Sequence, residues 1–259
     1  ASSDGAFLTW KTSHLSTFTK TVADADAEAY YTTADGVKYG SLAQAIQNVN
    51  KGGTITLQNE VTVSTEAISV DKDVKIDLNS HTITGNDTRV FHVKSGTLTL
   101  TGTGTVTSVK AEDGSLADNQ SVIRVGDNDG STDRKAALVV ESNVTIEAPD
   151  TYGISVFGSN ANETVTIYGI VKATGPAAAV SGNGSYDGTT ISLEGAKISA
   201  TCGVAIYHPQ DGTMTIKKST VGGGIEAKSG EITIENSTIS AVEGKKPSHD
   251  ESGDGPSTS

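Results

Sequence analysis

Pairs of apolar residues separated by a single residue, most often Thr, recur along the chain between residues 54 and 242. The second members of successive pairs are 18 to 40 residues apart. Alternation with a period of two is typical of β-strands. The pattern therefore predicts eight repeats that each begin with a short strand, called strand A here. The pairs are Ile55/Leu57, Ile76/Leu78, Leu98/Leu100, Leu138/Val140, Val165/Ile167, Ile191/Leu193, Met214/Ile216 and Ile232/Ile234.

Each repeat contains two further apolar stretches. The first follows strand A by four to six residues, as in Val61-Thr62-Val63, and predicts a strand B. The second predicts a strand C, and Asn, Gly and Ser between the strands predict turns. The strand C pairs are Ile68/Val70, Phe91/Val93, Ile123/Val125, Ile154/Val156, Ala178/Val180, Val204/Ile206 and Ile225/Ala227.

Three strands too short to fold alone, repeated eight times, predict a coil in which each strand pairs with its counterpart one repeat along. Inward residues then stack on inward residues of the next repeat, which constrains their size and polarity and leaves their identity free. We expect Val156, Val180 and Ile206 in one inward column. Leucine-rich repeats would need a fixed Leu and Asn spacing that is absent, and a sandwich would need regular hairpin turns.

The stretches "YGSLAQAIQNVNKGGTITLQNEVTVS" and "VKIDLNSHTITG" resemble the opening of right-handed parallel β-helix domains of pectate-lyase-like architecture in surface proteins of Gram-positive bacteria. The resemblance spans residues 31 to 242. It implies a single-stranded right-handed parallel β-helix whose open end is closed by an amphipathic helix at 41 to 50. Ser41 fits the N-cap, and Gly52-Gly53 ends the helix. Its apolar stripe would be Leu42, Ala45, Ile46 and Val49.

These patterns divide the chain into four parts. Residues 1–30 are either the remnant of a preceding sandwich domain with a linker, or an extra strand laid on the coil. Residues 31–53 form the capping segment with its helix, and residues 54–242 form the β-helix. Residues 243–259 are rich in Pro, Gly, Ser and Asp without an apolar period, which is typical of a flexible tail.

Composition narrows the partners and the location. The net charge of -12 argues against nucleic acid and anionic membranes. Cys202 is the only cysteine, so an internal disulfide and a cysteine-built zinc site are excluded. No run of about 18 apolar residues occurs. We expect an extracellular, secreted or wall-attached monomer that needs no cofactor, with a glycan or a cell-surface protein as partner.

The outer face of strand C is the predicted site. His92, Arg124 and Ser155 should be successive neighbours, and Phe157 and Tyr207 should lie outward roughly 10 Å apart. Two such rings predict a shallow platform for a glycan, with Arg124 available for a carboxylate. The alternative is that each ring covers a neighbouring loop. Tyr186 and His208 complete the predicted ligand-binding set.

The resemblance also implies an enzymatic alternative, a calcium-dependent polysaccharide lyase or a hydrolase. The candidate base would be Arg124, with His92 beside it. In "DNDGSTD", Asp127, Asp129 and Asp133 offer oxygen ligands for calcium, although Asp-Gly loops are commonly plain turns.

The leading hypothesis is a non-catalytic surface module, adhesive or spacer. A third hypothesis, ice binding by the Thr-x-Thr pattern of strand A, is weakened by Lys75, Asp77 and Val139, which interrupt the pattern.

Overall fold

A computed structural model describes residues 31–112, 114, 120–127, 132–158, 162–182, 188–208, 211–227 and 229–245. The predictions for residues 1–30 and for most of the tail therefore lie outside the described residues. The described chain is mostly β, with a single helix. Its parallel sheets form a nearly closed arrangement around one core.

The A strands form a ten-stranded sheet in which eight consecutive strands are parallel. Two short antiparallel strands, which the sequence did not indicate, complete it at the N-terminal end. In spatial order the strands are β2 (Lys38–Tyr39), β1 (Tyr31–Thr33), β3 (Thr54–Leu57), β6 (Val74–Asp77), β9 (Gly96–Thr101), β12 (Ala136–Val140), β15 (Glu163–Ile167), β18 (Thr189–Glu194), β20 (Gly212–Lys217) and β22 (Glu231–Glu235).

The B and C strands form two parallel ladders that meet at the C-terminal end. The B ladder comprises β4 (Val61–Val63), β7 (Thr82–Asn86), β10 (Gly104–Val109), β13 (Val144–Ala148) and β16 (Ile170–Ala173). The C ladder comprises β5 (Ile68–Val70), β8 (Phe91–Val93), β11 (Ser121–Val125), β14 (Tyr152–Val156) and β17 (Val180–Gly182). The long strand β19 (Lys197–His208) pairs with both β16 and β17, and β21 (Thr220–Ala227) and β23 (Thr238–Ser240) follow it.

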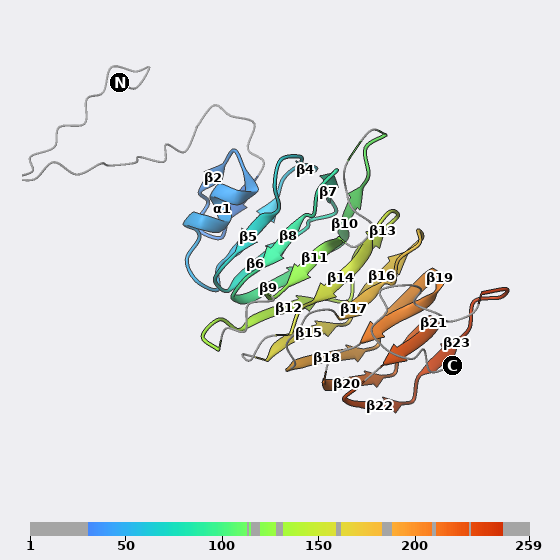
Figure 1. Cartoon of the computed structure of the whole chain (residues 1–259). Helices are drawn as coiled ribbons and strands as arrows, with labels where there is room; N and C mark the ends of the chain where they lie inside the picture. Colours follow the sequence, from blue (N-terminus) through green and yellow to red (C-terminus); the bar gives the residue numbers. More distant parts are fainter. Residues whose placement is uncertain are drawn as a thin grey trace, which may run out of the picture.

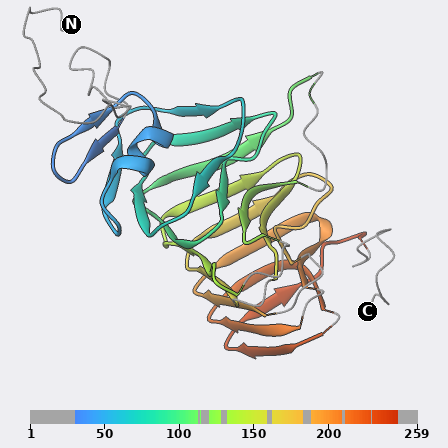
Figure 2. The same ribbon diagram turned by 60° about the vertical axis from the view of Figure 1, so that its left-hand side comes forward.

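The repeats stack in sequence order along one direction, from α1 to β22 and β23 (Figure 1). A second view shows the strands lying over one another in successive layers (Figure 2). The inward residues of all three ladders form one continuous cluster from Leu42 to Val221. The stack therefore has a single elongated core.

The helix α1 (Leu42–Asn48) lies at the N-terminal end of the stack, within the predicted segment. The Ser41 hydroxyl accepts a hydrogen bond from the Gln44 backbone N–H, which satisfies one free donor of the first turn. Leu42, Ala45 and Ile46 are buried against the first repeat. The helix thus covers apolar residues that would otherwise face water at the end of the core.

Several turns between the A and B strands contain a residue with left-handed backbone. Gly195, Lys218 and Asn236 have φ values of 65°, 49° and 49°. In two consecutive turns a serine links the repeats, because the Ser237 hydroxyl accepts from the Ser219 backbone N–H at 3.1 Å. The Ser219 hydroxyl in turn accepts from the Ala196 backbone N–H at 3.1 Å.

The register differs from the predicted alignment at one step of the A ladder. Ile76 pairs with Leu100, and Leu98 pairs with Val74, whereas the predicted alignment pairs Leu78 with Leu100. A shift of two residues leaves the same side chains inward, so the hydrophobic pattern does not reveal it.

The C ladder shows the same kind of correction. Val180 pairs with Ile154 and with Ile206, whereas Val156 pairs with Gly182. The predicted column of Val156, Val180 and Ile206 is therefore wrong in its first member. Buried Val156 does point inward, but in the neighbouring column.

Candidate functional site

The outer face of the C ladder brings together the polar residues that the sequence singled out. His92 on β8 pairs in register with Arg124 on β11, and Arg124 pairs with Ser155 on β14. These three strands lie side by side in the middle of the stack (Figure 1). The prediction that the three residues are successive neighbours is confirmed.

Asp127, just after β11, is the centre of this group. Its Oδ1 atom lies 2.9 Å from His92 Nε2 and 3.7 Å from Arg124 Nη2. Its Oδ2 atom lies 3.8 Å from Arg134 Nη1. The side chains of His92, Arg124 and Asp127 are 15%, 22% and 25% exposed, so solvent reaches the group. One carboxylate is thus shared by three basic residues.

The backbone of Gly126 organises the same group. Its carbonyl oxygen accepts a hydrogen bond from Arg124 Nε at 3.1 Å and lies 3.3 Å from His92 Nε2. Because Gly126 O and Asp127 Oδ1 are both acceptors, the neutral imidazole of His92 carries its proton on Nε2. That nitrogen therefore donates in this arrangement and is not placed to accept a proton.

Arg124 is also held from the other side. Its guanidinium carbon lies 4.0 Å from the centroid of the Phe157 ring, a cation–π geometry. Burial lowers the pKa of Arg124, and the negative charge of Asp127 opposes that shift. The side chain is thus fixed by an aromatic face, a carbonyl and a carboxylate.

Arg89, which precedes β8, joins the group without having been predicted. Its Nε donates to the Ser121 carbonyl at 3.3 Å. Burial lowers the pKa of Arg89 to about 10, with a further contribution from the positive charge of Arg124 and opposition from Asp127. It remains protonated at neutral pH.

His92 responds to the same surroundings. Burial lowers its pKa below the usual 6.5. Asp127 opposes this shift, while Arg124 and Arg89 add to it. His92 is therefore neutral at pH 7, and the positive charge of the group comes from the arginines.

Tyr207 does not take the predicted exposed position. Its side chain is 5% exposed and packs with Ala178 and Val204 in a small cluster apart from the main core, next to Tyr152 and Cys202. Ala178 and Val204, which the strand C pairs predicted as inward residues, belong to this cluster and not to the main one. The interpretation that the ring covers neighbouring residues fits Tyr207 better than the platform does.

Phe157 and Tyr207 are also not aligned. Tyr207 pairs with Ser181, which pairs with Ser155, so Tyr207 belongs to the column of Arg124. Phe157 is two residues beyond Ser155 and lies in the neighbouring column. The paired platform is therefore corrected to a single half-buried ring, Phe157, beside Arg124. Tyr186 lies outside the described residues.

His208 is buried and not placed for ligand contact. It is 1% exposed, and its Nε2 lies 2.8 Å from the Thr189 hydroxyl. Its Nδ1 has no hydrogen-bond partner in the described part of the chain. Burial lowers the pKa of His208. The residue belongs to the junction between β19 and β18.

The calcium set is only partly described. Asp127 is occupied by basic side chains, which disfavours a cation there, and the Thr132 hydroxyl donates to Asp133 at 3.1 Å. Asp129 lies outside the described residues, so the three-aspartate site stays a prediction. Among the residues that are described, no three His, Cys, Asp or Glu side chains are grouped closely enough to hold a metal ion.

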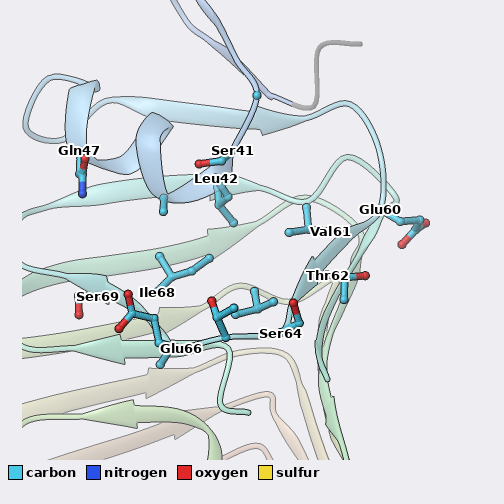
Figure 3. Close-up of a pocket in the computed structure, with 15 residues that line it drawn as sticks. Ser41, Leu42, Gln47, Glu60, Val61, Thr62, Ser64, Glu66, Ile68 and Ser69 are labelled. Carbon is cyan, nitrogen blue, oxygen red and sulfur yellow. The ribbon is translucent and has the colours of Figure 1, made fainter. Parts of the chain in front are cut away.

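A separate open pocket of about 850 Å³ lies at the N-terminal end, between α1 and the strands β4 and β5 (Figure 3). Leu42, Val61 and Ile68 form its apolar wall, and Ser64 and Glu66 belong to its polar part. β4 and β5 end their ladders, so each has one edge without a strand partner in the described chain. None of the predicted site residues lines this pocket.

The three arginines of the group are the only arginines in the chain. Sequence reasoning found Arg124 but missed Arg89 and Arg134. The small number of arginines in the chain was the signal that could have drawn attention to them. The distance between residues 89 and 134 along the chain concealed that both lie near Asp127.

Comparisons of this chain with protein-family models, with curated proteins and with solved structures found no significant match. None of the helices in the described segments is long and apolar enough to cross a membrane.

Proposed function

We propose that the chain is a right-handed, single-stranded parallel β-helix that acts outside the cell as a non-catalytic module of a surface protein. Its role is that of a spacer or adhesive segment able to bind a glycan. The observation that supports this most directly is the A ladder, in which eight consecutive strands pair in parallel without interruption from β3 to β22. In such stacks each repeat contacts only its neighbours, which produces an extended, stiff shape suited to display.

The state of Arg124 and His92 favours binding over catalysis. A base that abstracts a proton must be deprotonated, whereas Arg124 donates through Nε to the Gly126 carbonyl and faces Asp127, whose charge favours the protonated form against the effect of burial on the pKa of Arg124. His92 Nε2 faces two acceptors and donates to them. Both candidates for a catalytic base are thus engaged in holding the group together.

The test is an activity and binding screen of the same preparation. The chain is incubated with uronic-acid polysaccharides, with and without calcium, and the products are followed by size and by the absorbance of new double bonds. It is then applied to a glycan array. We expect binding without cleavage. Calcium-dependent cleavage that is lost in Arg124→Lys would replace this proposal with the lyase.

The proposed β-helix architecture and the expected monomeric state can be tested by separate measurements. Small-angle scattering should give an elongated particle with the mass of one chain. A crystal structure would fix the handedness of the coil. A compact particle, or a dimer that persists on dilution, would contradict the proposal.

A further inference from the structure

In the described part of the chain, the arginine group contains more guanidinium groups than carboxylates. Arg89, Arg124 and Arg134 carry three positive charges around Asp127, in a chain whose net charge is -12. Among the described residues, the second carboxylate near the group is that of Glu163, which is buried against Gly126. Within the described part of the chain, the three guanidinium groups thus outnumber the two carboxylates. Half-buried like charges repel one another, so an acidic chain that concentrates all its arginines here needs a reason.

The two inner arginines are anchored through Nε, and their terminal nitrogens make no hydrogen bond within the described residues. Arg124 donates through Nε to the Gly126 carbonyl, and Arg89 donates through Nε to the Ser121 carbonyl. Arg124 Nη2 is 3.7 Å from Asp127, which is longer than a hydrogen bond. Arg89 has no carboxylate within 4.0 Å among the described residues. The terminal nitrogens of both side chains therefore keep donors for another acceptor.

From this geometry we propose that Arg89 and Arg124, with Arg134 at the rim, form a binding site for an oxyanion, and that the anion is the carboxylate or sulfate of an acidic sugar. Guanidinium groups bind such planar or tetrahedral oxyanions through parallel N–H···O bonds. The assignment of the sugar rests on the glycan-binding role proposed above, whereas the assignment of the anion does not.

Two neighbours suit an acidic sugar. Phe157, on which Arg124 stacks, is half-buried and offers apolar surface next to the guanidinium. Lys94 follows β8 and lies in the backbone row of Gly126 and Phe157, because the Gly126 N–H donates to the Val93 carbonyl and the Phe157 N–H to the Val125 carbonyl. An acidic sugar presents an anion and apolar C–H groups together, which matches this arrangement.

Asp127 acts as the internal counter-charge of the site. It neutralises part of the group when no ligand is bound and competes with an external anion for the same donors. Asp127→Asn should therefore strengthen anion binding while it weakens the fold, because the arginines then lack their shared carboxylate. A role of the arginines limited to stability would not produce tighter binding in this variant.

The experiment titrates four probes by calorimetry into the full chain at low salt. They are a galacturonic acid trisaccharide, its methyl ester, the neutral galactose trisaccharide and a sulfated galactose trisaccharide. Arg89→Gln and Arg124→Gln are compared with Lys197→Gln, which removes the same charge from an exposed position on the B-ladder part of β19. Urea unfolding of each variant confirms that it is folded.

We expect the acidic trisaccharides to bind and the neutral ones not to bind. Loss of either guanidinium should weaken binding about 10- to 100-fold. Lys197→Gln should leave the affinity unchanged, and the two acidic probes decide between carboxylate and sulfate. Equal binding of the neutral probe, or unchanged affinity in both arginine variants, would overturn the proposal.

A second measurement separates the anion from the sugar. Inorganic sulfate is added at constant ionic strength, and the thermal midpoint is followed. If no trisaccharide binds but sulfate stabilises the wild type more than Arg89→Gln, the anion site stands and the glycan-binding role fails. If sulfate has no effect that depends on Arg89 and no acidic trisaccharide binds, the site itself is refuted.

Discussion

Gly126 provides the sharpest test of the site geometry, because the structure gives two independent reasons against any side chain there. Its φ of +83° lies in the left-handed region that residues with a Cβ rarely adopt. A Cβ atom would also lie 2.5 Å from the Phe157 carbonyl oxygen and 2.8 Å from Glu163 Cγ. The carbonyl of the same residue holds Arg124 and faces His92. Gly126→Ala should therefore disturb both the fold and the arginine group.

The magnitude follows from adding the two causes. Left-handed backbone costs a residue with a Cβ about 1–2 kcal/mol. Overpacking against a backbone oxygen, which cannot rotate away, adds about 1–3 kcal/mol. We expect Gly126→Ala to lower the free energy of unfolding by about 2–5 kcal/mol.

Two glycines of the same chain separate these causes. Gly195 has a φ of +65°, but an added Cβ would meet nothing within 4 Å, so Gly195→Ala should cost only the backbone strain. Gly40 has open space and no positive φ, so Gly40→Ala should be neutral or slightly stabilising. Urea unfolding followed by circular dichroism should rank the losses as Gly126, then Gly195, then Gly40. A Gly126→Ala variant as stable as Gly40→Ala would refute the close packing of β11 on β14 and β15.

Three further predictions follow from buried groups. The Ser108 hydroxyl is buried without a hydrogen-bond partner in the described chain. Ser108→Ala should therefore raise the free energy of unfolding by about 1 kcal/mol. A lower free energy of unfolding in urea would indicate that the hydroxyl has a hydrogen-bond partner. Burial lowers the pKa of His208, so the unfolded chain binds the proton more readily than the folded chain. The free energy of unfolding should therefore be constant above about pH 6.5 and fall as the pH drops below that value. His208→Gln should flatten this pH dependence. In double-mutant cycles, Ile206→Ala should couple to Val180→Ala by about 0.5–3 kcal/mol but add independently to Val156→Ala, and the reverse would restore the predicted column.

The sequence was sufficient to predict the strands because stacking imposes a simple rule. Inward positions must be apolar, must alternate with outward positions within a strand, and must recur in every repeat. Residues such as Ile55, Leu138 and Ile216 could therefore be assigned to the core from their spacing. The helix was predictable for the same reason, since Ser41 and the stripe from Leu42 to Ile46 satisfy local requirements. The two antiparallel strands β1 and β2 have three and two residues, which is too short to produce a pattern.

The pairing register between strands was harder to predict from the sequence than the choice of inward and outward residues within a strand. A slip of one residue would turn the apolar side chains of a strand outward, whereas a slip of two keeps them inward. Ile76 and Leu78 are both apolar, so either could pair with Leu100 at equal hydrophobic gain. The hydrophobic pattern does not contain the turn geometry, which also constrains the register. The misplacement of Tyr207 relative to Phe157 has the same origin.

Only part of the site was predictable, because its residues are far apart in the sequence and become neighbours through the pairing of the C strands. Arg124 and His92 could be paired once two C strands were aligned correctly. Arg89 and Arg134 lie outside the strands, before β8 and before β12, where no periodic pattern assigns them a direction. What connects them in the folded chain is Asp127, which forms ion pairs with Arg124 and Arg134 and whose negative charge acts on Arg89. The fold alone brings these residues together, and the proposed oxyanion site rests on that arrangement.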